Sequence, residues 1–262
     1  MIPTILHGDW VEQLRTLPEN SIDLTVTSPP YDSLRTYGGH KWEFEPGALE
    51  LFQVTKPGGI VCWNVNSQVV DGSETLTPFK QVIFFVEKCG FRLHDTMIYE
   101  KSNGSKPDAT RYHQCAEYVF VLSKGKPKTF NPIKDKPNVT AGKSCFGKHT
   151  MREKDGSMSV RKDRKVAAEY GTRTNVWKGN TRGQEDCGKA LPHPAMMPKW
   201  LAHDLILSFS NQGDTVLDPM AGSGTVGMES ISLGRKPILI DADAGYVKLI
   251  KQFCHVTPGL PL

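Results

Sequence analysis

The C-terminal part of this 262-residue chain carries the pattern that most restricts its fold. An apolar strand, Thr215–Leu217, runs into a tight glycine turn, DPMAGSGT (Asp218–Thr225), which opens a predicted helix over Val226–Leu233. A second strand, Pro237–Ile240, follows and ends at Asp241. This order predicts two neighbouring parallel strands, because parallel neighbours need a crossover connection and that connection is usually a helix.

The same alternation of strands and helices extends over the rest of the chain outside one segment. Further strands are expected at Ile2–Leu6, Asp23–Thr27, Ile60–Val65, His94–Glu100 and Glu117–Ser123, the last two as an antiparallel pair. Helices are expected at Val11–Leu17, Pro46–Val54, Leu76–Lys88, Trp200–Phe209 and Tyr246–Cys254, and Lys56–Gly59 should end the second of them. We therefore predict an α/β protein with a doubly wound, mostly parallel sheet.

The segment from Lys124 to about Arg182 interrupts this alternation and is strongly basic. It carries 16 Lys and Arg against 5 Asp and Glu, a net charge of +11, whereas the rest of the chain has −7. A charge run is often only a solvated surface, but its confinement to one segment of an otherwise acidic chain favours a polyanionic partner. The residues expected to contact phosphate groups are Arg161, Lys162, Arg164 and Lys165. The alternative is that these residues form only an exposed loop.

Composition argues against several other classes of protein. Hydrophobic residues make up 38% and charged residues 23%, no apolar run reaches the roughly 18 residues of a membrane helix, and the N-terminus does not read as a signal peptide. The six cysteines are spread singly, which argues against a zinc cluster or disulfides and for a reducing compartment such as the cytoplasm. His113 and Glu117 lie on a predicted strand, so we expect no metal. Trp63 and Trp177 are expected in the core.

The glycine turn suits a ligand that contains a nucleoside. Gly222 and Gly224 allow the backbone to approach a ligand closely, and Asp241 can accept hydrogen bonds from ribose hydroxyls. The turn alone would also fit a structural connection or a dinucleotide. Asp218 argues against a dinucleotide, because an anion beside the turn would repel a pyrophosphate but suits the ammonium of a methionine moiety.

A second turn, Ser28-Pro29-Pro30-Tyr31, follows the predicted strand Asp23–Thr27. Two consecutive prolines force the chain to turn. Because proline has no backbone N–H group, the turn offers carbonyl acceptors but lacks two backbone donors. Ser28 and the Pro29 carbonyl would accept the two hydrogens of an exocyclic amino group, while Tyr31 would stack on the base. Acceptors outside the ring plane favour a tetrahedral nitrogen, whose lone pair can attack a methyl sulfonium directly. An ordinary proline turn is the alternative.

Taken in order, these motifs resemble those of the amino-methylating DNA methyltransferases, which act on cytosine N4 or adenine N6. The resemblance is to the permuted beta group, whose catalytic turn precedes the cofactor turn, and it covers nearly the whole chain apart from the basic segment. The matching positions are Gly8-Asp9, Ser28–Tyr31, Lys56–Gly59, His193-Pro194 with Pro198, Asp218–Thr225, Asp241 and Tyr246.

The resemblance implies S-adenosylmethionine as cofactor and a role for each matched residue. Asp9 would accept from the adenine amino group and Asp241 from the ribose, and Ser28, Pro29, Pro30 and Tyr31 would be catalytic. The methionine end would be held by Asp218, Gly222, Ser223 and Thr225, with His193 and Pro194 nearby, and the cofactor-binding residues also include Met220 and Gly224. Two positions depart from the family: Met220 replaces a frequent aromatic residue, and Asp32 replaces a frequent Trp before the loop Ser33–Trp42.

The family's organisation implies a seven-stranded Rossmann-like methyltransferase sheet that is interrupted by a target-recognition region. Residues 1–123 would form the catalytic half, 124–190 the basic recognition region and 191–262 the cofactor-binding half. The substrate would be a base flipped from double-stranded DNA. A serine before the two prolines leans toward cytosine N4 over adenine N6, and the absence of a Pro-Cys pair disfavours carbon methylation. An RNA base methyltransferase and a catalytically silent DNA-binding module remain alternatives. A homodimer and a cognate restriction endonuclease are the further partners that the resemblance suggests.

Overall fold

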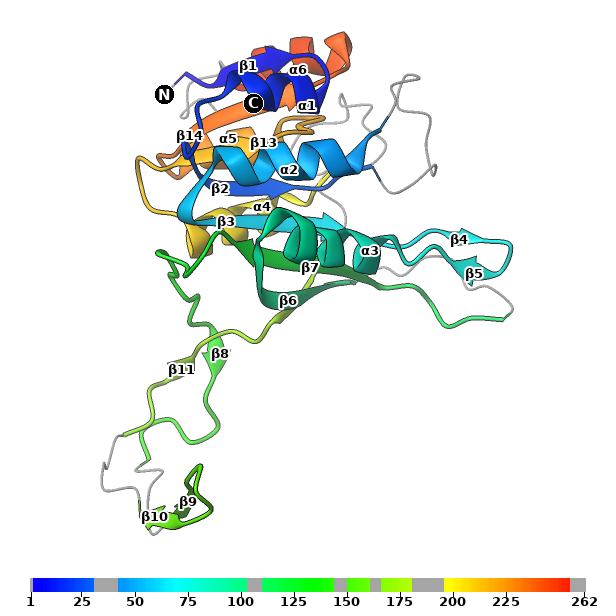
Figure 1. Ribbon diagram of the computed structural model, residues 1–262. Coiled ribbons are helices and arrows are strands. Elements are labelled where there is room, and N and C mark those ends of the chain that lie inside the picture. The colour runs from blue at the N-terminus through cyan, green and yellow to red at the C-terminus, as the bar shows by residue number, and fades with distance from the viewer. Residues whose placement is uncertain are drawn as a thin grey trace. The chain divides into compact units, whose positions relative to one another are not determined.

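The computed structural model describes residues 2–30, 42–102, 110–143, 150–160, 166–180 and 196–254. The chain forms two compact units. The first unit combines Met1–Asn131 with Asn175–Leu262, and the second consists of Pro132–Thr174. Figure 1 shows that the first unit holds the large sheet and its helices.

Within the described residues, the sheet of the first unit has eight strands in the order β1-β14-β13-β2-β3-β7-β6-β12. They are β1 (Thr4–His7), β2 (Ile22–Thr27), β3 (Thr55–Val65), β6 (Arg92–Lys101), β7 (Ala116–Ser123), β12 (Val176–Gly179), β13 (Thr215–Asp218) and β14 (Lys236–Asp241). Of these eight, only β7 runs against the others, since it is antiparallel to both β3 and β6. The predicted doubly wound, mostly parallel sheet is confirmed.

One strand more than the predicted seven is present. The additional strand is β12, which pairs in parallel with β6 at the edge of the sheet. The prediction missed it because it lies at the end of the basic segment, where strands and helices do not alternate.

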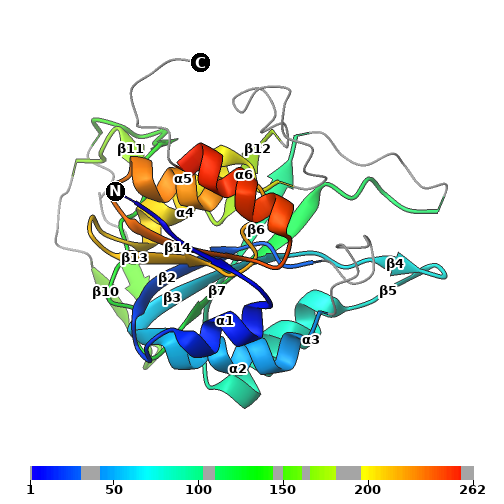
Figure 2. The ribbon, with the colours of Figure 1, turned by 90° about the horizontal axis from the view of Figure 1, so that it is seen from above.

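In the part of the chain that the structure describes, six α-helices cover the two faces of the sheet, three on each (Figure 2). On one face lie α1 (Trp10–Thr16), α2 (Phe44–Val54) and α3 (Thr77–Phe84), and on the other α4 (Lys199–Phe209), α5 (Thr225–Ser232) and α6 (Ala244–Cys254). In α2 the buried residues Ala48, Leu51 and Val54 recur every third residue, which places them on one side of the helix. Among the described residues no helix is both long and apolar enough to cross a membrane.

Helix α2 ends at Val54, before Lys56–Gly59, as predicted, but this segment lies inside the strand that was expected to begin only at Ile60. Strand β3 already begins at Thr55, and its pairing with β2 shifts register between Ile22 and Leu24, so the segment forms a bulge inside the strand. Gly58 adopts a φ of 86°, and its N–H donates to the Lys124 carbonyl at 2.6 Å. The bulge explains how a proline can sit within an interior strand.

The predicted helix Leu76–Lys88 is present but changes its winding. Helix α3 continues into a π-helical turn, η1 (Phe85–Cys89), and the chain leaves it at Gly90 with a φ of 92°. Between β3 and α3 the short strands β4 (Val69–Val70) and β5 (Ser73–Glu74) form a hairpin.

The second unit contains short antiparallel pairs. Strand β8 (Lys136–Pro137) pairs with β11 (Tyr170–Gly171), and β9 (Thr150–Arg152) pairs with β10 (Met158–Val160). An ion pair between Arg173 and Asp135 joins its two ends. The unit lies within the predicted region 124–190, whose role in target recognition stays a prediction, and residues 161–165 lie outside the described residues.

The main core lies between the sheet and helices α1 to α3. Trp63 is completely buried at its centre, and Trp177 on β12 is 7% exposed, so both predicted core tryptophans are confirmed. Trp10 of α1 lies 6.3 Å from Trp63 between ring centroids and also covers Gly47 of α2. Close contact between α1 and α2 therefore depends on a glycine at this position.

We expect Gly47→Ala to destabilise the protein by about 1–3 kcal/mol, the usual cost of overpacking a core. An added Cβ would lie 1.9–2.3 Å from three atoms of the Trp10 ring, which outweighs the better helix propensity of alanine, worth about 1 kcal/mol. Urea denaturation measures the change. Leu49→Ala, at a 45% exposed position of the same helix, is the control and should change stability little. A gain in stability for Gly47→Ala would contradict the packing argument.

Candidate active site

Five adjacent strands of the sheet, β1, β14, β13, β2 and β3, run parallel and end at the same edge. In that order, the residues at or just beyond their ends include Asp9, Asp241, Asp218, Ser28 and Asn64. Neighbouring strands lie about 4.8 Å apart, so Asp9 and Ser28 are separated by about 14 Å along the edge. Ligands of open α/β sheets bind at this carboxyl edge.

Asp241 holds the glycine turn closed. Its Oδ2 accepts from the Gly222 N–H at 2.7 Å, and its Oδ1 accepts from the Asp243 N–H at 2.9 Å. Gly222 and Gly224 have φ values of 51° and 82°, which favour glycine. A carboxylate oxygen can accept more than one hydrogen bond, so these two bonds are compatible with the predicted contact of Asp241 with ribose hydroxyls, which stays a prediction.

The next carboxylate along the edge, Asp218, is buried beside Thr27, which precedes the predicted catalytic turn. Its Oδ1 accepts from the Thr27 hydroxyl at 2.8 Å and from the Met220 N–H at 3.2 Å. Burial, aided by the negative charge of Asp241 and opposed by these two hydrogen bonds, raises the pKa of Asp218 to about 7. A bound cation would favour the ionised form.

Asp9 lies at the end of β1 and caps helix α1. Its Oδ1 accepts from the N–H groups of Val11 and Glu12 at 2.9 and 3.2 Å. The Gly8 N–H donates to the Asp241 carbonyl at 3.0 Å, which fixes Asp9 next to the glycine turn. The predicted contact of Asp9 with an adenine amino group would use the other carboxylate oxygen.

The turn that the sequence predicts to be catalytic begins where β2 ends, at Thr27, as expected. Pro29 is buried, whereas Ser28 and Pro30 are partly exposed. The structure thus brings these three residues to the same edge as the cofactor turn. Tyr31, Asp32, residues 33–41, His193 and Pro194 lie outside the described residues.

The remaining residues of the predicted cofactor turn lie where the motif places them. The hydroxyls of Ser223 and Thr225 are 3.1 Å apart, and both side chains are buried at the start of α5. Met220 packs against the main core, so an apolar contact replaces the family's frequent aromatic residue. Thr27, which holds Asp218, is a residue that the sequence reasoning missed; its position directly before the proline turn was the available signal.

A buried polar cluster borders the catalytic turn on its other side. Asn64 of β3 donates from Nδ2 to Glu117 Oε2 and to the Tyr118 carbonyl, both at 3.1 Å. Glu117 also forms an ion pair with Lys101 at the end of β6. The sequence reasoning weighed Glu117 only as a metal ligand beside His113 and missed this cluster. The one clue was an asparagine in the otherwise apolar run Ile60–Val65.

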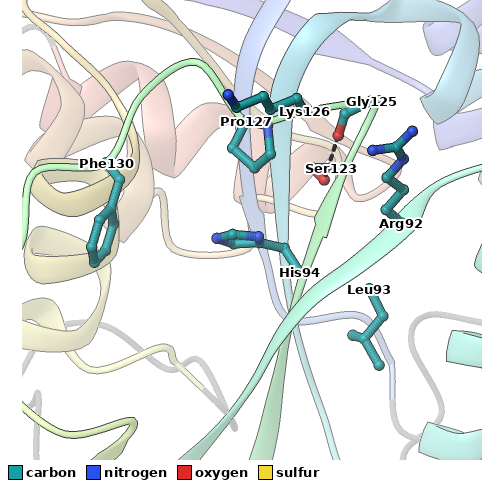
Figure 3. A pocket seen from close by; sticks show the side chains of 8 residues that line it. All are labelled: Arg92, Leu93, His94, Ser123, Gly125, Lys126, Pro127 and Phe130. Carbon is teal, nitrogen blue, oxygen red and sulfur yellow. Dashed lines mark hydrogen bonds between the residues drawn. The ribbon is translucent and has the colours of Figure 1, made fainter. Parts of the chain in front are cut away.

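A separate hollow lies at the opposite edge of the sheet (Figure 3). Its volume is about 450 Å³, and it is lined by Arg92, Leu93, His94, Ser123, Gly125, Lys126, Pro127 and Phe130. Because Arg92 begins β6 and Lys101 ends it, this hollow lies a strand's length away from the carboxyl edge. It is therefore not part of the candidate active site.

A doubly wound sheet with a glycine turn and carboxylates at its carboxyl edge defines the chain as a Rossmann-like α/β protein. Residues 22–252 match the family model of the N6/N4 methylases, whose description is "DNA methylase". The match covers most of the chain, and the chain therefore belongs to this family of DNA methylases.

Three comparisons place the chain among known proteins. It is 44% identical over 238 residues to the orphan methyltransferase M.BamHII of Bacillus amyloliquefaciens, which covers 90% of this chain and 87% of that protein. The structure of the PvuII DNA methyltransferase, titled cytosine-N4-specific, superposes with a TM-score of 0.70, covers 100% of this chain and 89% of that one, and at 20% identity shows the fold alone. A DNA modification methylase of Thermus thermophilus, solved in complex with S-adenosyl-L-methionine, has a TM-score of 0.64 and 25% identity over 99% of this chain and 96% of that one.

Proposed function

We propose that this chain transfers a methyl group to the N4 amino group of a cytosine flipped out of duplex DNA. The methyl donor is S-adenosylmethionine. The observation that carries the proposal is the position of Ser28-Pro29-Pro30, which follows β2 directly beside the end of β13, where the Thr27 hydroxyl contacts Asp218. The turn that would hold the base and the carboxylate that would hold the donor are thus neighbours.

The order of the carboxylates along the carboxyl edge of the sheet matches the order of the chemical groups in the cofactor. Asp9 would accept from the adenine amino group, Asp241 from the ribose hydroxyls and Asp218 from the methionine ammonium. Their spread over β1, β14 and β13 matches an extended nucleoside lying along the edge. When it is bound, the cofactor supplies an electrophilic methyl group on a sulfonium.

The catalytic turn would prepare the amino nitrogen for attack. Ser28 and the Pro29 carbonyl accept its two hydrogens, so the lone pair leaves conjugation with the ring and points at the methyl carbon. The bound cofactor would supply the methyl group for the new nitrogen–carbon bond, and its sulfur would keep the electron pair of the carbon–sulfur bond. The methylated nitrogen then releases one proton toward the acceptors of the turn and solvent.

The basic segment would hold the duplex. Phosphate contacts from region 124–190 would fix the register of the DNA, and the unstacking of one base costs a few kcal/mol. The homodimer and the cognate endonuclease suggested by the sequence stay predictions.

The identity of the methylated base tests the proposal. Duplex DNA incubated with labelled S-adenosylmethionine and then digested to nucleosides should contain labelled N4-methylcytosine, which mass spectrometry separates from N6-methyladenine. The same reaction with RNA serves as the control. Label only in N6-methyladenine would assign the adenine alternative, and label only in RNA would contradict a DNA substrate.

A further inference from the structure

The register of the sheet places a buried amide next to the catalytic serine. Thr27 of β2 pairs with Trp63 of β3, so the following residues, Ser28 and Asn64, lie side by side about one strand spacing, ~4.8 Å, apart. Asn64 is only 2% exposed. A buried amide is costly unless its polar atoms are hydrogen-bonded, so the partners of Asn64 decide what it can do.

The hydrogen bonds of Asn64 fix which way its amide faces. Nδ2 lies 3.1 Å from both Glu117 Oε2 and the Tyr118 carbonyl, on β7. A carboxylate and a peptide carbonyl only accept hydrogen bonds, so the amide must present its NH₂ to them and spends both N–H groups there. Oδ1 is therefore turned away from these two acceptors of β7.

The ion pair behind Asn64 keeps this orientation. Glu117 is 8% exposed and is paired with Lys101, which reaches across from β6. A carboxylate oxygen and a peptide carbonyl both accept hydrogen bonds, so a flipped amide would place Oδ1 against two acceptors. A buried ion pair can often be replaced by apolar residues without loss of stability. The Glu117–Lys101 pair is therefore better explained by its effect on the orientation of the Asn64 amide than by a contribution to stability.

We propose that Asn64, oriented by the Glu117–Lys101 pair, is a positioning residue for Ser28. Asn64 Oδ1 accepts the hydrogen of the Ser28 hydroxyl, so the lone pairs of the hydroxyl oxygen face the amino group of the target base. Without this acceptor, the hydroxyl rotates and spends part of its time donating to other groups. The inference rests on the proposed function, because it assumes that Ser28 contacts the base.

Two variants test the orientation in different ways. Asn64→Leu keeps the branched shape of the side chain and removes the acceptor, and we expect kcat to fall about 10²-fold, as when one preorganised polar contact is lost. Glu117→Gln can donate to Asn64 Oδ1 and so lets the amide flip, and we expect a smaller fall in kcat, about 10-fold. The dissociation constant of the cofactor should change less than about twofold in both, because the cofactor carboxylates lie on other strands.

The matched control is Gln81→Leu. Gln81 is another buried amide that contacts β3, since its Oε1 accepts from Trp63 Nε1 at 2.8 Å, but it lies toward the core of the α1–α3 face. This variant should lower the thermal unfolding temperature and leave kcat within about twofold. If Asn64→Leu and Glu117→Gln likewise lower only the unfolding temperature, the cluster is merely structural and the inference is wrong.

A double-mutant cycle with Ser28→Ala decides whether Asn64 acts through Ser28. Single-turnover tritium transfer is measured for each single variant and for the pairs. We expect Asn64→Leu to have almost no effect on the rate once Ser28 is replaced, and Glu117→Gln provides the same cycle if Asn64→Leu fails to fold. An equal loss in both backgrounds overturns the inference but leaves the proposed function intact. Full activity of Ser28→Ala would overturn the proposed function itself.

Discussion

Replacing both Ser28 and Tyr31 with alanine should abolish the transfer of tritium from labelled S-adenosylmethionine to DNA. The double variant keeps the two prolines, so the turn retains its shape but loses the hydroxyl acceptor and the aromatic ring. Loss of a single preorganised acceptor costs about 10²–10³-fold in kcat, and loss of base stacking adds about 1–3 kcal/mol. We expect a combined fall of more than about 10³-fold.

Cofactor affinity separates this catalytic effect from a loss of structure. Ser28 follows β2, whereas Asp9 and Asp241 stand at the ends of β1 and β14, so calorimetry should give nearly the same dissociation constant as for the unchanged protein. Undiminished tritium transfer by a double variant that binds the cofactor would refute the assignment of this turn as catalytic.

The parts of the fold that could be predicted are those set by short-range signals. Helix α4, predicted at Trp200–Phe209, spans Lys199–Phe209, because its apolar spacing and its preceding proline are local features. The antiparallel pair β6 and β7 was likewise visible as two apolar runs around a polar stretch. Local patterns therefore identified most elements and, through their alternation, the mostly parallel sheet.

The parts that could not be predicted depend on contacts between distant residues. The bulge at Lys56–Gly59 is held by a hydrogen bond from the Gly58 N–H to the carbonyl of Lys124, and Lys124 comes directly after β7 in the sequence. Strand β12 is defined only by its pairing with β6. Neither pairing leaves a periodic trace in the short segments concerned.

The candidate site divides in the same way. The turn at Ser28 and the turn at Asp218 were found from their own motifs, because each motif encodes a local backbone shape. The bond from Thr27 to Asp218 spans 191 residues, and the bond from Asn64 to Glu117 spans 53. Such partners follow only from the order of the strands, which single motifs do not specify.

Asp218 should make cofactor binding depend on pH. Burial raises the pKa of this carboxyl to about 7 in the cofactor-free protein, so the carboxyl is mainly neutral at pH 6 and mainly ionised at pH 7.5. In the proposed site the ammonium of the cofactor would pair with the ionised form, so affinity should rise with pH, approaching tenfold per pH unit below the pKa. Because the folded-state pKa is raised, the folded protein binds the additional proton, and stability without cofactor should fall as pH rises from about 4 to about 7.

Asp218→Asn removes the charge and keeps the shape. The amide oxygen can still accept from Thr27 and from the Met220 N–H, so the turn should remain folded. We expect affinity for S-adenosylmethionine at pH 7.5 to fall about 10²-fold, the usual worth of a charge-assisted contact, and its dependence on pH to flatten. Titration calorimetry between pH 6 and 7.5 measures both. Asp214→Asn is the control, because Asp214 lies before β13 and accepts from the Asn211 N–H at 2.7 Å, and it should bind like the unchanged protein. An Asp218→Asn protein that kept the original affinity and slope would show that the methionine ammonium is held elsewhere.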